Sequence, residues 1–152
     1  MNTTVAATGN ATETRSVVIE RELPHPPEKV WRALTQPALL AEWMMANDFQ
    51  PVVGHRFKFT AEPVANWDGV VRCEVLEVQP HSKLSYRWGV GGADAASGLS
   101  TVVTLTLTPT GKGTLLRMEQ SGFGPGREQN IQGAKYGWQR FLGGLEKVLA
   151  QI

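Results

Sequence analysis

The sequence has only one cysteine, Cys73, and this excludes an internal disulfide framework. A reducing cytoplasm is therefore the expected location, with Cys73 as a small buried hydrophobe in a strand. The three histidines, His25, His55 and His81, are far apart in the chain, and no pair has the spacing of metal ligands. We expect neither a metal site nor a cofactor.

A dominant charge and long apolar runs are also lacking. The 152 residues include 15 basic and 14 acidic side chains without a basic run, so nucleic acid is not an expected partner. No apolar stretch approaches the roughly 20 residues that a membrane-spanning helix needs. Residues 1–15 carry neither the basic start nor the apolar run of a secretory signal. We expect them to be a flexible tail and residues 16–152 to form a single domain.

After the expected tail, the patterns predict a strand and two short helices. Ser16–Leu23 is the predicted strand, and Pro27 and Pro37 each suit the first turn of a short helix. The two helices are expected to turn a shared set of apolar side chains inward, namely Val30, Trp31, Leu34, Leu39, Leu40 and Trp43.

The middle of the chain is typical of an antiparallel meander of about six strands joined by short turns. The alternation breaks near Val75 and Leu76, where a bulge would explain it. The clearest strand patterns are HRFKFTA (55–61), GVVRCEVLEV (69–78), KLSYRW (83–88), STVVTLTLTP (100–109) and TLLRMEQSGF (114–123).

The last 22 residues, 131–152, predict a long amphipathic helix that contains several glycines. Gly133, Gly137 and Gly144 fall along one edge of its apolar stripe, and Gly143 falls on the opposite side. Each glycine inside a helix costs about 1 kcal/mol relative to alanine. Two interpretations of the glycine edge stay open, namely close packing against another element and the wall of a ligand cavity.

The order of these elements predicts an α+β protein. A curved antiparallel sheet of about six or seven strands would wrap around the long C-terminal helix, with two short helices after the first strand. The helix would cover the apolar face of the sheet, and this arrangement often leaves a cavity between helix and sheet.

Several segments resemble, in the same order, the family named for the activator of the heat-shock protein 90 ATPase. They are PPEKVWRALTQPALLAEWM, WDGVVRCEVLEVQPHSKLSYRW, TVVTLTLTPTGKGTLLRMEQSGF and the late pair Gly137-Trp138. The resemblance covers residues 16–152 and implies the helix-grip fold of the SRPBCC, or START-like, superfamily. It also implies a link to the stress response and a functional range from lipid carriers and hormone receptors to polyketide cyclases and co-chaperones. The eukaryotic co-chaperone has an additional N-terminal domain where this chain has its short tail.

Inward-facing side chains are the candidates for the walls of a cavity, and simple core packing is the alternative for most of them. The hydroxyl of Tyr86 needs a partner if it is buried, and a ligand is one such partner. Trp67 suits either a pocket mouth or the anchor of a loop. The candidate cavity residues are Trp43, Phe57, Phe59, Trp67, Cys73, Tyr86, Trp88, Leu105, Met118, Gly137, Trp138 and Phe141.

Catalytic motifs are not evident, because the chain has neither a Gly-x-Ser-x-Gly sequence nor a phosphate-binding glycine loop. His55, Tyr86 and Gln120 are inward polar candidates that support acid–base chemistry only if they converge. The alternating charges Arg72, Glu74, Arg117 and Glu119 are interpreted as cross-strand ion pairs on the exposed face.

Three functions follow as hypotheses. The first is a monomeric or homodimeric protein that binds an apolar or amphipathic small molecule between helix and sheet. The second is a cyclase, aromatase or hydrolase that uses the same cavity and two or more titratable groups. The third is a co-chaperone-like interaction module with a filled core. Cavity volume separates the third from the others, and inward acids or bases separate the second from the first.

Overall fold

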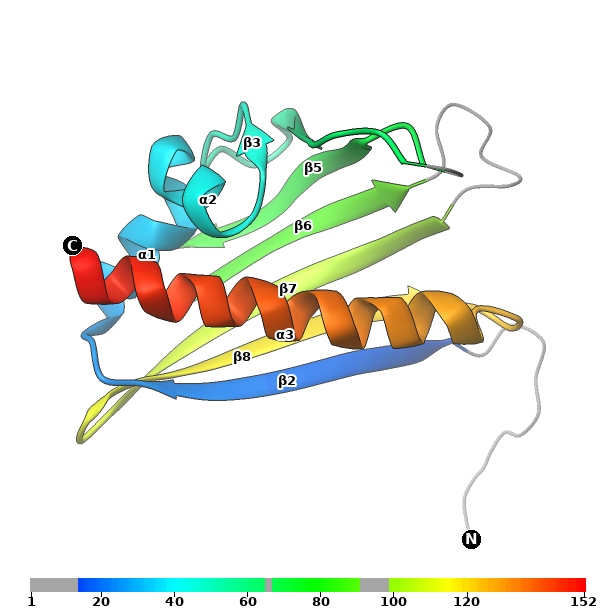
Figure 1. The fold of residues 1–152 in the computed structure, drawn as a ribbon. Helices are drawn as coiled ribbons and strands as arrows, with labels where there is room; N and C mark the ends of the chain where they lie inside the picture. The colour runs from blue at the N-terminus through cyan, green and yellow to red at the C-terminus, as the bar shows by residue number, and fades with distance from the viewer. Residues whose placement is uncertain (1–13, 65–66, 91–98) are drawn as a thin grey trace, which may run out of the picture.

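Seven antiparallel strands form one curved sheet in the computed structural model, which describes residues 14–64, 67–90 and 99–152 (Figure 1). The order across the sheet is β2-β8-β7-β6-β5-β4-β3. Strands β3 to β8 form a meander, and β2 pairs with β8 at one edge of the sheet. The elements are β2 (Arg15–Leu23), α1 (Pro27–Thr35), α2 (Pro37–Trp43), β3 (Ala46–Asn47), β4 (Arg56–Thr60), β5 (Val70–Gln79), β6 (Lys83–Val90), β7 (Leu99–Thr110), β8 (Gly113–Phe123) and α3 (Glu128–Gln151).

The α+β helix-grip fold predicted from the sequence is confirmed. Both short helices begin at the expected prolines, Pro27 and Pro37, because a proline in the first turn gives up only an N–H that has no helical partner. The predicted bulge is present, since the pairing of β5 with β6 shifts register between Val75 and Glu77. Residues 1–13 of the expected tail lie outside the described part of the chain.

Alternating burial explains which face of the sheet meets the helix. Along β7, Val103, Leu105 and Leu107 are buried, whereas Thr108 is exposed. α3 lies across the buried face and packs against α1, α2 and β2 (Figure 1). Residues three and four apart on one helix face supply its apolar side. The buried positions of α3 are Ile131, Trp138, Leu142, Leu145, Val148 and Leu149.

Polar contacts hold α3 along the edge strand β2. Arg21 donates a hydrogen bond of 3.0 Å from Nη1 to Oε2 of Glu146, and its Nη2 contacts the side chain of Gln139. Arg15 pairs with Glu128 at the start of the helix. These contacts fix the position of α3 against the edge of the sheet that β2 forms.

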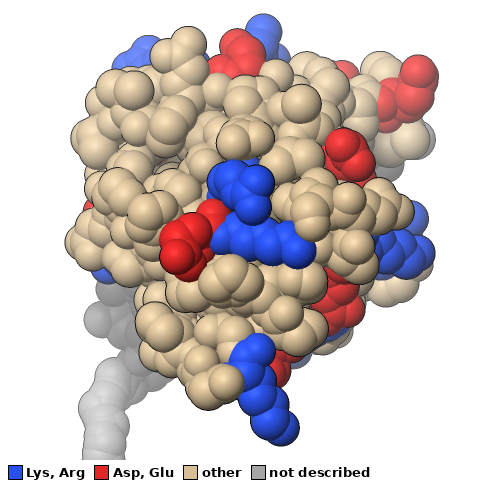
Figure 2. All heavy atoms as spheres, turned by 90° about the vertical axis from the view of Figure 1, so that its left-hand side faces the viewer, with Lys and Arg blue, Asp and Glu red and all other residues tan. Residues whose placement is uncertain are grey.

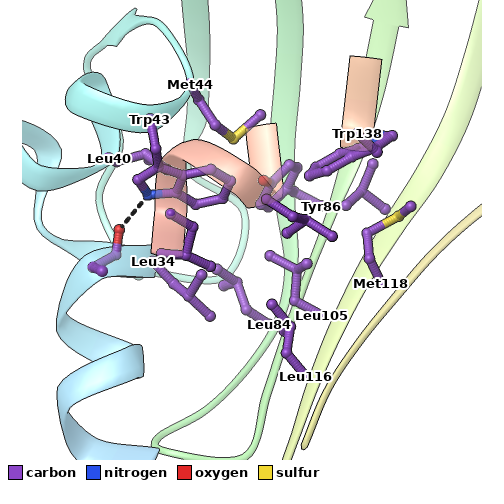
Figure 3. Close-up of a cluster of buried hydrophobic side chains, with 14 of the residues drawn as sticks. Leu34, Leu40, Trp43, Met44, Leu84, Tyr86, Leu105, Leu116, Met118 and Trp138 are labelled. Carbon is purple, nitrogen blue, oxygen red and sulfur yellow. Dashed lines mark hydrogen bonds between the residues drawn. The ribbon is translucent and has the colours of Figure 1, made fainter. Parts of the chain in front are cut away.

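The helices α1 and α2 fill one end of the layer between α3 and the sheet. Figure 3 shows Leu34, Leu40 and Trp43 pointing toward sheet residues such as Leu84 and Leu105. All five are at most 5% exposed. The Trp43 Nε1–H donates to the carbonyl oxygen of Ala33 at 2.9 Å, so the indole is fixed in this core. This end of the molecule is therefore packed.

The outer surface carries charges of both signs. On the face at the C-terminal end of α3, Lys and Arg side chains lie beside Asp and Glu side chains among many uncharged residues (Figure 2). Within residues 14–64, 67–90 and 99–152, no helix has both the length and the apolar character needed to cross a membrane.

Candidate functional site

A pocket of about 470 Å³ lies at the end of the layer opposite α1 and α2. The N-terminal half of α3 supplies one wall, and the adjacent ends of β6, β7 and β8 supply most of the other. Figure 1 shows these segments at the same end of the molecule. Its described lining consists mainly of aromatic, aliphatic and glycine residues. They are Trp67, Trp88, Val90, Leu99, Gln120, Phe123, Gln129, Asn130, Gly133, Ala134, Gly137, Trp138 and Phe141.

The glycine edge of α3 divides into two parts with different surroundings. A Cβ atom added at Gly133 or Gly137 would meet no atom within 4 Å, and both residues line the pocket. A Cβ at Gly144 would lie 3.3 Å from the Cβ of Trp43, so this glycine allows α3 to approach α2 closely. The glycine edge therefore does not have one explanation for all its positions. Packing explains Gly144, and open space lies beside Gly133 and Gly137.

A chain of hydrogen bonds holds one polar group in the pocket wall. The Trp138 Nε1–H donates to Oε1 of Gln120 at 2.9 Å, and Nε2 of Gln120 donates to Oγ1 of Thr101 at 2.8 Å. The Thr101 hydroxyl in turn donates to the carbonyl oxygen of Trp88 at 3.4 Å. Gln120 is only 2% exposed. The chain fixes the orientation of its amide, because the indole can only donate and therefore faces the amide oxygen.

Trp67 is both a pocket wall and a loop anchor. Its Nε1–H donates to the carbonyl oxygen of Val70 at 3.1 Å, and its backbone pairs with Val64 in an isolated bridge. The same ring lines the pocket and is half-buried. The two readings of Trp67 from the sequence are thus compatible, because the anchoring bond holds the ring at its place in the wall.

The structure brings five of the twelve candidate cavity residues to the pocket. They are Trp67, Trp88, Gly137, Trp138 and Phe141. The other seven, all buried, lie in the packed core and not among the described lining residues. They are Trp43, Phe57, Phe59, Cys73, Tyr86, Leu105 and Met118. Figure 3 labels four of them, Trp43, Tyr86, Leu105 and Met118.

Other lining residues were missed by the sequence reasoning. On α3, Asn130 and Ala134 precede Gly137 and Phe141 by seven residues, so helical spacing places them on the same face. That spacing was a usable signal. Val90, Leu99 and Phe123 stand at strand ends, where alternation says little about what lies opposite.

Tyr86 sits in the core with an unpaired hydroxyl. Its ring is packed among Phe49, Phe57 and Phe59, with centroids 6.4, 5.4 and 6.2 Å away. Its hydroxyl oxygen has no hydrogen-bond partner among the described residues. Burial raises the pKa of this hydroxyl, and the neighbouring Cys73 adds to the rise. The pKa of the Cys73 thiol is raised in the same way, first by burial and then by Asp48.

Replacing Tyr86 by phenylalanine is expected to raise the free energy of unfolding by about 1 kcal/mol, because it removes a buried hydroxyl without a partner. In the folded protein, the raised pKa keeps the Tyr86 hydroxyl neutral. In the unfolded chain, the same hydroxyl ionises above about pH 10. Stability of the unaltered protein should therefore fall above that pH, and Tyr86→Phe should flatten the fall. Urea unfolding at neutral and alkaline pH measures both effects.

Trp138→Phe is the contrasting control for Tyr86→Phe. Trp138→Phe deletes the indole N–H and leaves the side-chain oxygen of Gln120 without its donor. We therefore expect the free energy of unfolding to fall by roughly 1–3 kcal/mol. A comparable loss in Tyr86→Phe would contradict the assignment of an unpaired hydroxyl.

The polar residues considered for catalysis do not meet in the pocket. His55 Nε2 lies 3.0 Å from the carbonyl oxygen of Asp48, Tyr86 is in the core, and only Gln120 lines the pocket. Within the described parts of the chain, no group of three or more His, Cys, Asp or Glu side chains is placed to hold a metal ion.

The expected cross-strand ion pairs are realised only in part. Arg117 pairs with Glu20 across the strands at 3.9 Å and with Glu119 along its own strand at 3.0 Å. Arg72 pairs instead with Asp68 at 3.4 Å, in the turn before β5. The turn brings that carboxylate back over the strand, which the alternation of charges did not reveal.

Comparisons with known proteins identify relatives of this chain. The protein-family model described as Activator of Hsp90 ATPase homolog 1-like protein matches residues 24–150. No curated protein matches the chain.

Solved structures share its fold along most of its length. Protein MLL2253 from Mesorhizobium loti is 55% identical, with a TM-score of 0.83, and the match covers 90% of this chain and 98% of that one. DynU16, a protein in the dynemicin biosynthetic locus, is 28% identical with a TM-score of 0.74, and the match covers 89% of this chain but 47% of DynU16. Protein CV1439 from Chromobacterium violaceum is 25% identical with a TM-score of 0.70, and the match covers 88% of this chain and 96% of that one.

Proposed function

The chain belongs to the Activator of Hsp90 ATPase homolog 1-like family, and we propose that it binds an apolar or amphipathic small molecule in the pocket between α3 and the sheet. We place this binding in the cytoplasm, because the free, buried Cys73 is in keeping with a reducing compartment. DynU16, which is 28% identical to this chain, is described as a protein in the dynemicin biosynthetic locus, and a small-molecule function for this chain is in keeping with that description.

The observation that carries this proposal is the open space beside Gly133 and Gly137. Glycine inside a helix costs about 1 kcal/mol relative to alanine, and close packing normally accounts for that cost. Packing accounts for Gly144 but not for these two residues, because a Cβ at either would touch nothing within 4 Å. Two positions without side chains in the helix wall, facing a pocket of about 470 Å³, leave room for a bound small molecule.

The lining supports an amphipathic occupant. Most of it is apolar, but Gln120 places one carboxamide deep in the wall, and Gln129 and Asn130 place two more on the exposed first turn of α3. Ligand pockets commonly combine a mainly apolar wall with a few polar anchors.

The two other hypotheses fit the pocket less well. An enzyme of cyclase or hydrolase type needs titratable groups that face the substrate, whereas the described lining offers carboxamides and apolar side chains. An interaction module predicts a filled core, whereas this layer is filled at the α1–α2 end and open at the other. Binding without chemistry is therefore the function that we propose.

Native mass spectrometry of freshly purified protein, paired with a denaturing run, tests the proposal. We expect a reproducible mass excess that disappears on denaturation, because the apolar pocket retains its occupant through purification. The matched measurement is thermal unfolding with added apolar and amphipathic compounds, since a ligand that binds only the folded state raises the melting temperature. A bare mass together with no stabilisation by any compound would contradict small-molecule binding.

A further inference from the structure

We propose that the occupant is an uncharged, flat aromatic molecule that carries an oxygen acceptor, and this rests on the proposed function. Aromatic rings dominate the apolar lining, with five of them among the described residues. Aromatic faces and edges attract flat rings in stacked or edge-on arrangements, which adds to the gain from burial alone. The five rings belong to Trp67, Trp88, Phe123, Trp138 and Phe141.

The rings form angled walls. The centroids of Trp88 and Trp138 lie 5.8 Å apart with their planes at 47°, and those of Trp138 and Phe141 lie 5.5 Å apart at 81°. A flat molecule can lie against one ring of such a corner and present its face or edge to the next. Because Trp138 also holds a hydrogen bond to Gln120, its plane is fixed before a ligand arrives. A flexible aliphatic chain gains little from fixed, angled planes.

The lining favours a molecule without charge. Among the described residues that line the pocket, there is no Lys, Arg, His, Asp or Glu. A carboxylate or an ammonium group taken into this site would lose its hydration without meeting an opposite charge. The polar groups available are carboxamides, which suit hydroxyl and carbonyl groups.

Gln120 points to an oxygen acceptor on the ligand. One hydrogen of its Nε2 goes to Thr101, and its oxygen accepts from Trp138. The other Nε2 hydrogen makes no hydrogen bond to any described residue, although the side chain is 2% exposed and lines the pocket. Buried N–H groups are almost always paired. A hydroxyl or carbonyl oxygen of the ligand would complete this pairing, which makes Gln120 the residue that selects for that group.

Four probes of one skeleton test the proposal on the unaltered protein by isothermal titration calorimetry at neutral pH. They are 2-naphthol, naphthalene, decahydro-2-naphthol and 2-naphthoate. We expect 2-naphthol to bind most tightly, and naphthalene about tenfold more weakly because it lacks the oxygen. The saturated alcohol lacks the flat rings and the naphthoate carries a charge, so each should also be weaker by about tenfold or more.

The variant Gln120→Met tests the selecting residue. It keeps a side chain of similar length without the amide, and it also removes the acceptor that holds the Trp138 indole. The absolute affinities can therefore change, so the readout is the ratio of the two affinities: the preference for 2-naphthol over naphthalene should disappear. Gln79→Met, at an exposed position of β5, is the control and should leave all four affinities unchanged. If Gln120→Met folds and still prefers 2-naphthol over naphthalene, Gln120 is not the residue that selects for the oxygen. If the variant does not fold, the probe series on the unaltered protein still tests the ligand class.

The outcomes separate this inference from the proposed function. If decahydro-2-naphthol or 2-naphthoate binds as tightly as 2-naphthol, the flat, uncharged aromatic class is wrong while small-molecule binding stands. If no probe binds but native mass spectrometry finds another occupant, the flat aromatic class is again wrong and small-molecule binding again stands. If no probe binds and no occupant is found by any measurement, both fail together.

Discussion

Replacing Gly137 by leucine is expected to abolish small-molecule binding without destabilising the fold. The new side chain would start in open space, since a Cβ at this position meets no atom within 4 Å, and it would extend into the pocket. Leucine also gains about 1 kcal/mol of helix propensity over glycine. We expect affinity for any pocket ligand to fall roughly hundredfold or more, equivalent to about 2.7 kcal/mol. Calorimetry and thermal unfolding of the same preparation measure the two effects.

Gly143→Leu is the matched control for Gly137→Leu. Gly143 lies on the same helix, and a Cβ there would also meet nothing within 4 Å, but it does not line the pocket between α3 and the sheet. The gain in helix propensity should be the same, and binding should be unaffected. If Gly137→Leu instead loses roughly 1–3 kcal/mol of stability, the position is a packing contact and the space is not available to a ligand.

The contrast between Gly137 and Gly144 shows what the sequence alone can establish. Helical spacing places both on one edge of the stripe, and it predicts that edge correctly. What stands opposite each residue depends on α2, whose Trp43 reaches Gly144 but not Gly137. A one-dimensional pattern carries the direction of a side chain but not the element that it meets.

The same distinction explains the fold and the site as a whole. Periodicity predicts α1, α2, α3 and the long strands, because each buries one face over many residues. β3 was missed, because Ala46 and Asn47 are too few to show a period. Trp43 and Trp138 both point inward, as expected, yet the first is enclosed by the packed end of the layer and the second lines the open end. Inward orientation was predictable, and the position of the opening was not.

Gly69→Ala is expected to cost roughly 2–5 kcal/mol of stability, through backbone strain and a steric clash together. Gly69 has φ of +81°, and a Cβ there would lie 2.3 Å from the carbonyl oxygen of Ala61 and 3.1 Å from the backbone nitrogen of Pro63. The Ala61 backbone cannot move freely, because its N–H donates at 2.8 Å to the oxygen of Gly69 itself. Urea unfolding measures the loss of stability.

Gly54→Ala separates the two causes of that loss. Gly54 has a similar φ of +89°, but a Cβ there would meet nothing within 4 Å, so only the strain of about 1–2 kcal/mol is expected. The difference between the variants therefore measures the clash at Ala61. Because the strained turn also positions Trp67 in the pocket wall, Gly69→Ala should weaken ligand binding and Gly54→Ala should not. Equal losses in both variants would mean that the turn around Gly69 yields to a methyl group, and that it does not hold Trp67 rigidly in the wall.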